Sequence, residues 1–130
     1  MLIGQVAERS GVTAKTLRFY ERKGLLADPG RTDGGYRDYE PATVDRVTFI
    51  KDAQAAGLTL AQIGEVLAIR DDGQLPCEHV TTLVARRLAA VEQRLRELRQ
   101  VRAQLREIAD RAERYDPDDC DGYCGLISSA

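Results

Sequence analysis

A stretch of nearly forty residues, from Cys77 to about Tyr115, contains neither glycine nor proline. Its apolar side chains step by three and four positions, which is the heptad spacing of a coiled-coil helix. They are Leu88, Val91, Leu95, Leu98, Val101 or Arg102, Leu105, Ile108 and Ala112. One helix of this length needs a partner to cover its apolar stripe, and the sequence offers no second long helix. The pattern therefore predicts a homodimer.

The beginning of the chain reads as two short helices joined by a tight turn. Ile3 and Val6 begin an apolar stripe at helical spacing, and Gly11 stops that helix. Thr13 is a suitable N-cap for the next helix, AKTLRFYERKG, which ends at Gly24. The arrangement predicts a helix-turn-helix.

The second of these helices is expected to present hydrogen-bond donors on one face, with Leu17 and Phe19 turned to the core. The donors are Lys15, Thr16, Arg18, Tyr20, Arg22 and Lys23. A helix that lies in the major groove of DNA has this composition. The net charge of the whole chain is −2, but residues 1–37 hold seven Lys/Arg against four Asp/Glu. A local excess of positive charge favours phosphate binding.

The next segment carries two strong turn signals, at residues 28–30 and 33–35. Two very short strands around them predict a hairpin, or wing. Arg31, Tyr36 and Arg37 are expected to project from the wing, where they can reach phosphates.

A second pair of helices is predicted after the wing. Pro41 opens the first, which ends at Gly57, and Thr59 caps the second. Their inward positions are Val44, Val47, Phe49, Ile50, Ala53, Leu60, Ile63, Val66 and Leu67. Residues 71–76 form a break before the long helix.

Composition narrows the class of protein further. The 130 residues contain no apolar run long enough to span a membrane and no visible signal peptide, so we expect a cytoplasmic protein. No nucleophile–base pair, acid pair or phosphate-binding loop is evident, which disfavours an enzyme.

These segments, in this order, resemble the MerR family of bacterial transcription regulators. The resemblance rests on IGQVAERSGVTAKTLRFYERKGLL, on the wing GGYRDY, on VDRVTFIKDAQAAGLTLAQIGEVL, and on the long helix followed by a cysteine loop. It implies a mainly all-α fold with three parts. Residues 1–75 would form a winged helix-turn-helix domain, 76–116 a dimerisation helix in an antiparallel coiled coil, and 117–130 a metal-binding loop and tail.

The resemblance also implies an activity. Family members bind a two-fold symmetric operator in double-stranded promoter DNA and distort it so that RNA polymerase can use the promoter, which makes specificity partly a matter of deformation energy. The contacts carried over by resemblance are Thr16, Arg18 and Tyr20 on the recognition helix and Tyr36 and Arg37 on the wing. For Tyr20 and Tyr36 the alternative is that they are packing aromatics.

The three cysteines match the family's ligand positions. Metal sensors of this family hold their inducer between the start of one subunit's dimer helix, here Cys77, and the other subunit's loop, here Cys120 and Cys124. Thiolates select soft ions, and a cysteine at position 77 is typical of sensors for divalent Zn, Cd, Hg or Pb. A tetrahedral zinc site would need a fourth ligand, which His79, Asp119 or Asp121 can supply.

Other interpretations of the same residues stay open. The C-x3-C loop is shorter than in the mercury, copper and zinc sensors, and the two loop thiols alone would suit Cu(I). Cys120 and Cys124 can also form a disulfide, which would make a redox-responsive regulator. A metal-buffering protein with a vestigial DNA-binding domain is a further alternative, and His79 can be an ordinary solvated side chain.

Overall fold

Two short helices open the chain, as the sequence predicts. In the computed structural model, α1 (Ile3–Ser10) ends at Gly11, which adopts the left-handed conformation with φ of 74°. The N–H of Gly11 donates to the carbonyl of Ala7 at 3.0 Å and closes the helix. The Thr13 side chain accepts a hydrogen bond from the N–H of Thr16 at 3.1 Å and begins α2 (Ala14–Arg22). The predicted helix-turn-helix is confirmed.

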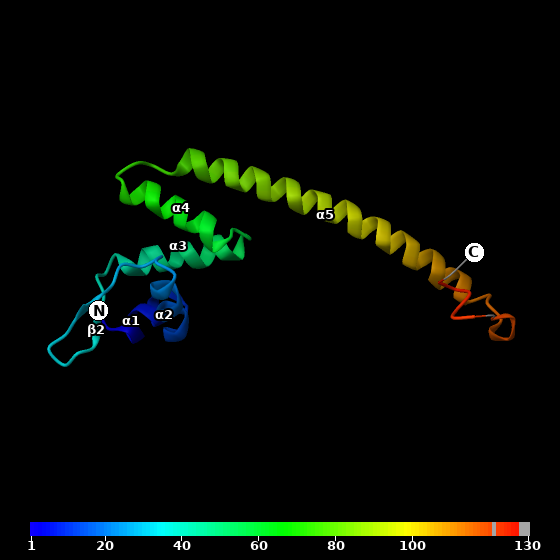
Figure 1. Cartoon of the computed structure of the whole chain (residues 1–130), viewed down its shortest axis with the longest axis horizontal. Coiled ribbons are helices and arrows are strands. Elements are labelled where there is room, and N and C mark those ends of the chain that lie inside the picture. Colours follow the sequence, from blue (N-terminus) through cyan, green and yellow to red (C-terminus); the bar gives the residue numbers. More distant parts are fainter. Residues whose placement is uncertain (121, 128–130) are drawn as a thin grey trace. The chain divides into compact units, whose positions relative to one another are not determined.

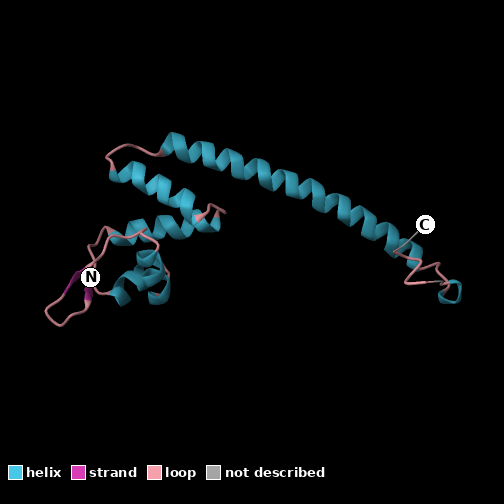
Figure 2. Ribbon diagram, in the orientation of Figure 1, coloured by secondary structure: helices cyan, strands magenta, loops and turns pink. Residues whose placement is uncertain are grey.

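The structure describes residues 1–120 and 122–127, and the expectations for Asp121 and for the side chain of Asp119 fall outside that description. The chain divides into two compact units, residues 1–87 and 88–130. The elements after α2 are β1 (Gly30–Arg31), β2 (Arg37–Asp38), α3 (Thr43–Ala55), α4 (Leu60–Asp71), α5 (Cys77–Ala112) and a short 3-10 turn, η1 (Pro117–Asp119). The described fold is thus mainly helical, as expected (Figures 1 and 2).

The core of the first unit lies where α1, α2, α3 and α4 meet. α1 packs against both α2 and α3, and α3 packs against α4. The side chains that are almost wholly buried are Val6, Leu17, Tyr20, Val47, Ile50, Ile63 and Val66. They recur at helical spacing because each helix turns one apolar stripe inward. Tyr20 is the member of this set that the sequence analysis placed on the opposite face.

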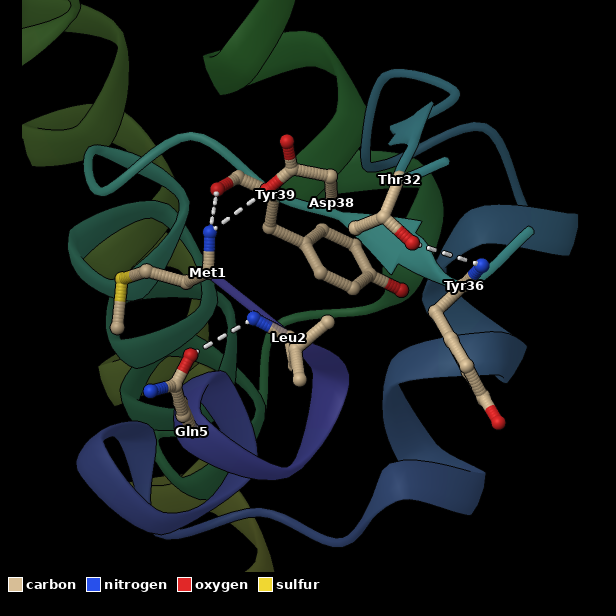
Figure 3. Close-up of polar contacts among 7 residues, drawn as sticks. All are labelled: Met1, Leu2, Gln5, Thr32, Tyr36, Asp38 and Tyr39. Atoms are coloured by element: carbon tan, nitrogen blue, oxygen red, sulfur yellow. Dashed lines mark hydrogen bonds and ion pairs between the residues drawn. The ribbon is translucent and has the colours of Figure 1, made fainter. Parts of the chain in front are cut away.

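The wing is a two-stranded antiparallel hairpin in which Arg31 pairs with Arg37. Gly35, with φ of 82°, makes the turn. The base of the wing is fixed to the start of α1, because the Met1 amino group donates to the Asp38 carboxylate at 2.9 Å and to the Tyr39 carbonyl at 2.7 Å (Figure 3). The wing therefore stands at a fixed place beside α1.

Arg46 of α3 joins three parts of the first unit. Its guanidinium donates to both oxygens of Asp71 at the end of α4, at 2.8 and 3.1 Å. Its Nε donates to the Leu25 carbonyl, after α2, at 2.7 Å. The first of these bonds holds the pKa of Asp71 below its usual range. The bidentate contact holds α3 to the end of α4, and the bond to Leu25 fixes this second helix pair against the segment after α2.

The first turns of α5 belong to the first unit. Leu83 is only 4% exposed and lies in the common core, with Val80 packed beside it. His79 Nε2 lies 3.2 Å from Glu65 Oε2 of α4. The first compact unit consequently runs past residue 75 to Arg87.

The second unit holds the rest of α5 and the cysteine loop. The predicted apolar seam is present as a row of side chains that are 39–59% exposed in the single chain, from Leu88 to Leu105. The loop after the helix folds back onto its last turn, where Arg111 Nη2 donates to the Leu126 carbonyl at 3.0 Å. This contact fixes where the loop returns to the helix.

Candidate nucleic-acid interface and thiol loop

A groove of about 610 Å³ lies between the start of α1, the side of α2 and the wing. Arg18 of α2 lines it together with Arg31 and Arg37 of the wing, and Glu8 is the one carboxylate of the lining. Three arginines against one carboxylate give the lining a net positive charge, and the low-dielectric walls of a groove concentrate its field. The groove is therefore suited to bind a polyanion.

The predicted contact residues do not share one environment. Arg18 and Tyr36 are exposed, and the Tyr36 side chain at the wing tip is 70% exposed. Figure 3 shows its backbone nitrogen donating to the hydroxyl of Thr32, at 3.2 Å, which steadies the turn. Thr16 is half-buried, and its hydroxyl shares a 2.9 Å hydrogen bond with that of Thr13.

Tyr20 does not face the groove, and the prediction that it contacts DNA is wrong. Its ring is 2% exposed, and its hydroxyl donates to Gln54 Oε1 of α3 at 2.7 Å. Burial raises the pKa of this phenol. The reason is the helical period: position 20 is three residues after the buried Leu17 and so lies on the same face. The packing alternative is the correct one for this residue.

Arg37 is held by a network that the sequence analysis missed. Its Nε lies 3.3 Å from Glu21 Oε2, and the Tyr39 hydroxyl donates to the other oxygen of the same carboxylate. Burial, and secondly this hydrogen bond, raise the pKa of Tyr39. The sequence signal for this network is Glu21, an acidic residue within a basic recognition helix. The network joins the wing to α2 and sets the direction of the guanidinium.

The three cysteines are free thiols. Cys77 is the exposed first residue of α5, whereas Cys120, exposed, and Cys124, partly buried, follow the end of that helix. Within residues 1–120 and 122–127, no three Cys, His, Asp or Glu side chains gather in a position to hold a metal ion. A single chain therefore does not assemble the predicted ligand set in the parts described.

The loop thiols differ in their surroundings. The hydrogen bond from the Tyr115 hydroxyl, followed by one from the backbone of Gly125, lowers the pKa of Cys120. The same bond to Cys120 is the main reason that the pKa of Tyr115 is raised. A thiol whose anion is stabilised in this way is a suitable ligand for a soft metal ion. The donor chemistry of the loop thus fits the predicted inducer.

His79 is engaged elsewhere. Its ring nitrogen pairs with Glu65 of α4, as given above, so the side chain lies against the first unit. The sequence allows either a fourth metal ligand or a solvated side chain at position 79, and the half-exposed place of this α5 residue beside α4 is nearer to the second.

None of the described helices is both long and apolar enough to cross a membrane. The fold of the first unit, with its wing and cationic groove, is that of a winged helix-turn-helix protein. Residues 1–68 match the family described as MerR HTH family regulatory protein, and residues 44–108 match the family described as MerR, DNA binding. The chain belongs to the MerR family.

Individual relatives agree with this assignment. The mercuric resistance operon regulatory protein of Bacillus cereus is 33% identical over 128 residues, covering 98% of this chain and 94% of its own length. The transcriptional regulator CueR of Escherichia coli O6:H1 is 34% identical, over 92% of this chain and 89% of its own. The regulator PbrR691 of Ralstonia metallidurans CH34, solved in complex with lead(II), is 32% identical with a TM-score of 0.76, covering 99% and 98% of the two chains.

Proposed function

We propose that this protein is a metal-responsive transcription regulator that binds a palindromic promoter operator as a homodimer. The arginine-lined groove between α1, α2 and the wing is the observation that carries the DNA-binding part. In this proposal Arg18 contacts a base edge or a phosphate of the DNA, and Tyr36 and Arg37 contact the DNA backbone. Thr16 lies at the edge of the contact. Arg31, which lines the same groove, joins this set.

The homodimer is supported by the exposed seam of α5. Six large apolar side chains, from Leu88 to Leu105, are 39–59% exposed in one chain. A helix with such a stripe is stable in water when a second helix covers it. An antiparallel pairing of two copies of α5 would bury both stripes and would give the dimer the two-fold symmetry of a palindromic operator.

The metal site of this proposal is shared between two chains. Cys77 begins α5, and Cys120 and Cys124 follow its end, 36 helical residues later. Since an α-helix rises about 1.5 Å per residue, a continuous helix of this length keeps its two ends apart. Antiparallel pairing would bring Cys77 of one subunit to the loop of the other. Three thiolates there would bind a divalent thiophilic ion such as Hg, Cd, Pb or Zn.

The relatives support a soft metal as the inducer without choosing among ions. The relatives include a mercuric resistance regulator, the regulator CueR and a regulator solved in complex with lead(II). The alternative inducers within the same family are Cu(I), bound by the two loop thiols alone, and an oxidant that joins Cys120 to Cys124.

The contacts of α5 suggest how metal binding would reach the DNA. Cys77 lies six residues before Leu83, which is buried in the common core of the first unit. A metal ion that pulls on the first residue of α5 would thus act on the DNA-binding unit through a packed helix rather than a loose linker. Reorienting the two wings would bend or untwist the operator, so that RNA polymerase in the bacterial cytoplasm could use the promoter.

The test begins with selection of operators from random duplex DNA by the reduced, metal-free dimer. An inverted repeat is expected, and Arg18→Ala should bind it more weakly at the same salt concentration. Transcription from a promoter that carries this repeat should then rise with a divalent ion but not with an oxidant. If no specific repeat were recovered, the proposal that this protein is a transcription regulator would be refuted. Induction by oxidant alone would favour the redox alternative.

A further inference from the structure

Glu21 lies on the recognition helix α2, where an uncompensated negative charge would repel the phosphates of DNA. Its side chain is only 15% exposed, and both of its carboxylate oxygens are bonded to the wing segment. Oε2 lies 3.3 Å from Nε of Arg37, and Oε1 accepts a hydrogen bond from the Tyr39 hydroxyl. The carboxylate thus joins the last strand of the wing and the residue after it to α2.

Tyr39 is itself fixed in the fold. Its side chain is 3% exposed and belongs to the core of the first unit. Its backbone N–H donates to the Met1 carbonyl at 2.7 Å, and its own carbonyl accepts from the Met1 amino group at 2.7 Å, a contact that Figure 3 shows. The phenol therefore holds the Glu21 carboxylate from a fixed position, and the carboxylate in turn gives Arg37 a fixed partner.

The bond to Glu21 leaves most of the Arg37 guanidinium available. It occupies the Nε donor, so that among the described residues the Nη donors remain for a phosphate. The Arg37 side chain is 28% exposed and lines the groove between α1, α2 and the wing. An arginine whose direction is set before DNA arrives loses less conformational freedom on binding.

We propose that Glu21 is a positioning residue, which locks the wing to the recognition helix so that Arg37 meets a backbone phosphate only where that helix is in register with the operator. The inference rests on the proposed function, because the DNA contact of Arg37 is part of that proposal. The charge of Glu21 opposes binding to any duplex, whereas its bonds favour the duplex on which helix and wing are both seated. Glu21 therefore raises specificity at the expense of affinity for random DNA.

Glu21→Gln removes the bond to Arg37 with little change of shape. The carboxamide oxygen can still accept from Tyr39, but the amide nitrogen and Arg37 Nε are both donors. Operator affinity should fall roughly 2–10-fold, the cost of ordering one long side chain on binding. Affinity for a random duplex at the same salt concentration should rise, because one negative charge is lost. Glu8→Gln removes the carboxylate of the groove lining and should raise both affinities.

Arg37→Ala supplies the background in which positioning cannot act. The Glu21 carboxylate would there lack its cation and would repel the phosphates. Glu21→Gln should therefore raise operator affinity in the Arg37→Ala protein, which is the reverse of its effect in the parent. The same change of affinity in both backgrounds would overturn the positioning role, because it would show that Glu21 acts through its charge alone.

Tyr39→Phe tests the same network without any change of charge, because it removes only the hydroxyl that holds Glu21. Tyr20→Phe is the matched control, since it removes another buried hydroxyl, which is bonded to Gln54 away from the groove. Operator affinity should fall in Tyr39→Phe and equal that of the parent in Tyr20→Phe. Equal operator affinities for the two variants would overturn the role of Glu21.

All of these affinities are measured by fluorescence anisotropy of the full-length protein, with the selected operator and a random duplex of equal length at one salt concentration. A parent protein that prefers no duplex would refute the proposed function. A parent that prefers its operator, together with a Glu21→Gln variant that binds the operator more tightly, would leave that function intact and overturn the positioning role.

Discussion

Leu83→Ala tests whether the first turns of α5 are structurally part of the DNA-binding unit. Leu83 is 4% exposed and contacts the common core. The substitution removes three buried carbons, worth about 0.8 kcal/mol each in transfer free energy. The residual cavity adds to this loss, so we expect the free energy of unfolding to fall by about 3 kcal/mol, within the 2–5 kcal/mol known for such changes.

The assay is urea unfolding of the reduced, metal-free protein at one fixed protein concentration, because the stability of a dimer depends on concentration. Leu75→Ala is the matched control, since the same atoms are removed from a side chain that is 88% exposed. It should change the free energy of unfolding by no more than about 0.5 kcal/mol. If Leu83→Ala lost no more stability than Leu75→Ala, the packing of α5 into the first unit would be refuted.

Three further predictions concern the first unit. Tyr20→Phe should lower the free energy of unfolding by about 1 kcal/mol, through loss of the bond to Gln54, yet leave operator affinity unchanged; weaker operator binding at full folding would restore Tyr20 to the interface. Arg18→Ala should weaken operator binding by about 1–3 kcal/mol at matched salt, measured by fluorescence anisotropy, and an unchanged affinity would remove it from the contact set. The lowered pKa of Asp71 means that its bond to Arg46 stabilises the fold above the carboxyl's unfolded pKa and that this gain is lost as pH falls through the folded value. Asp71→Asn should therefore lower the free energy of unfolding by less than about 1 kcal/mol at neutral pH, because the carboxyl is more than half exposed. In strong acid the two proteins should have the same free energy of unfolding. A difference that grew on acidification would mean that the assigned sign is wrong.

The helices and their ends could be predicted from sequence because their causes are local. Thr13 caps α2 and Gly11 ends α1 through contacts within a few residues, and both signals stand in the sequence. The mostly exposed seam of α5 follows from a spacing of three and four residues. Such features depend on period and capping, which a single sequence records.

The prediction that Tyr20 contacts DNA failed because of the same helical period. Its residue type suggested a hydrogen-bond donor for DNA, but its position relative to Leu17 placed it in the core. When residue type and helical position disagree, the burial of a large aromatic ring contributes more than leaving it exposed for a contact with DNA. The helical position was the better guide.

The contacts around the thiols were beyond reach of the sequence. The pairing of Arg111 with Leu126, and the place of the Tyr115 hydroxyl beside Gly125, join residues of an irregular loop with the end of a helix. No period or motif encodes such contacts, because they depend on how the loop returns. The cysteines themselves could be found, since their chemistry is visible in the residue type alone.

Metal binding by mixed dimers tests the shared thiol site most directly. Cys77→Ser and Cys120→Ser each remove one ligand from both sites of a homodimer, so each variant alone should bind Cd(II) weakly. In a mixed dimer, one site keeps Cys77 from one chain and an intact loop from the other. Subunit exchange between the two variants should thus restore tight binding at one site per mixed dimer. If the mixed dimers form and bind no better than the separate variants, the site shared between subunits is contradicted.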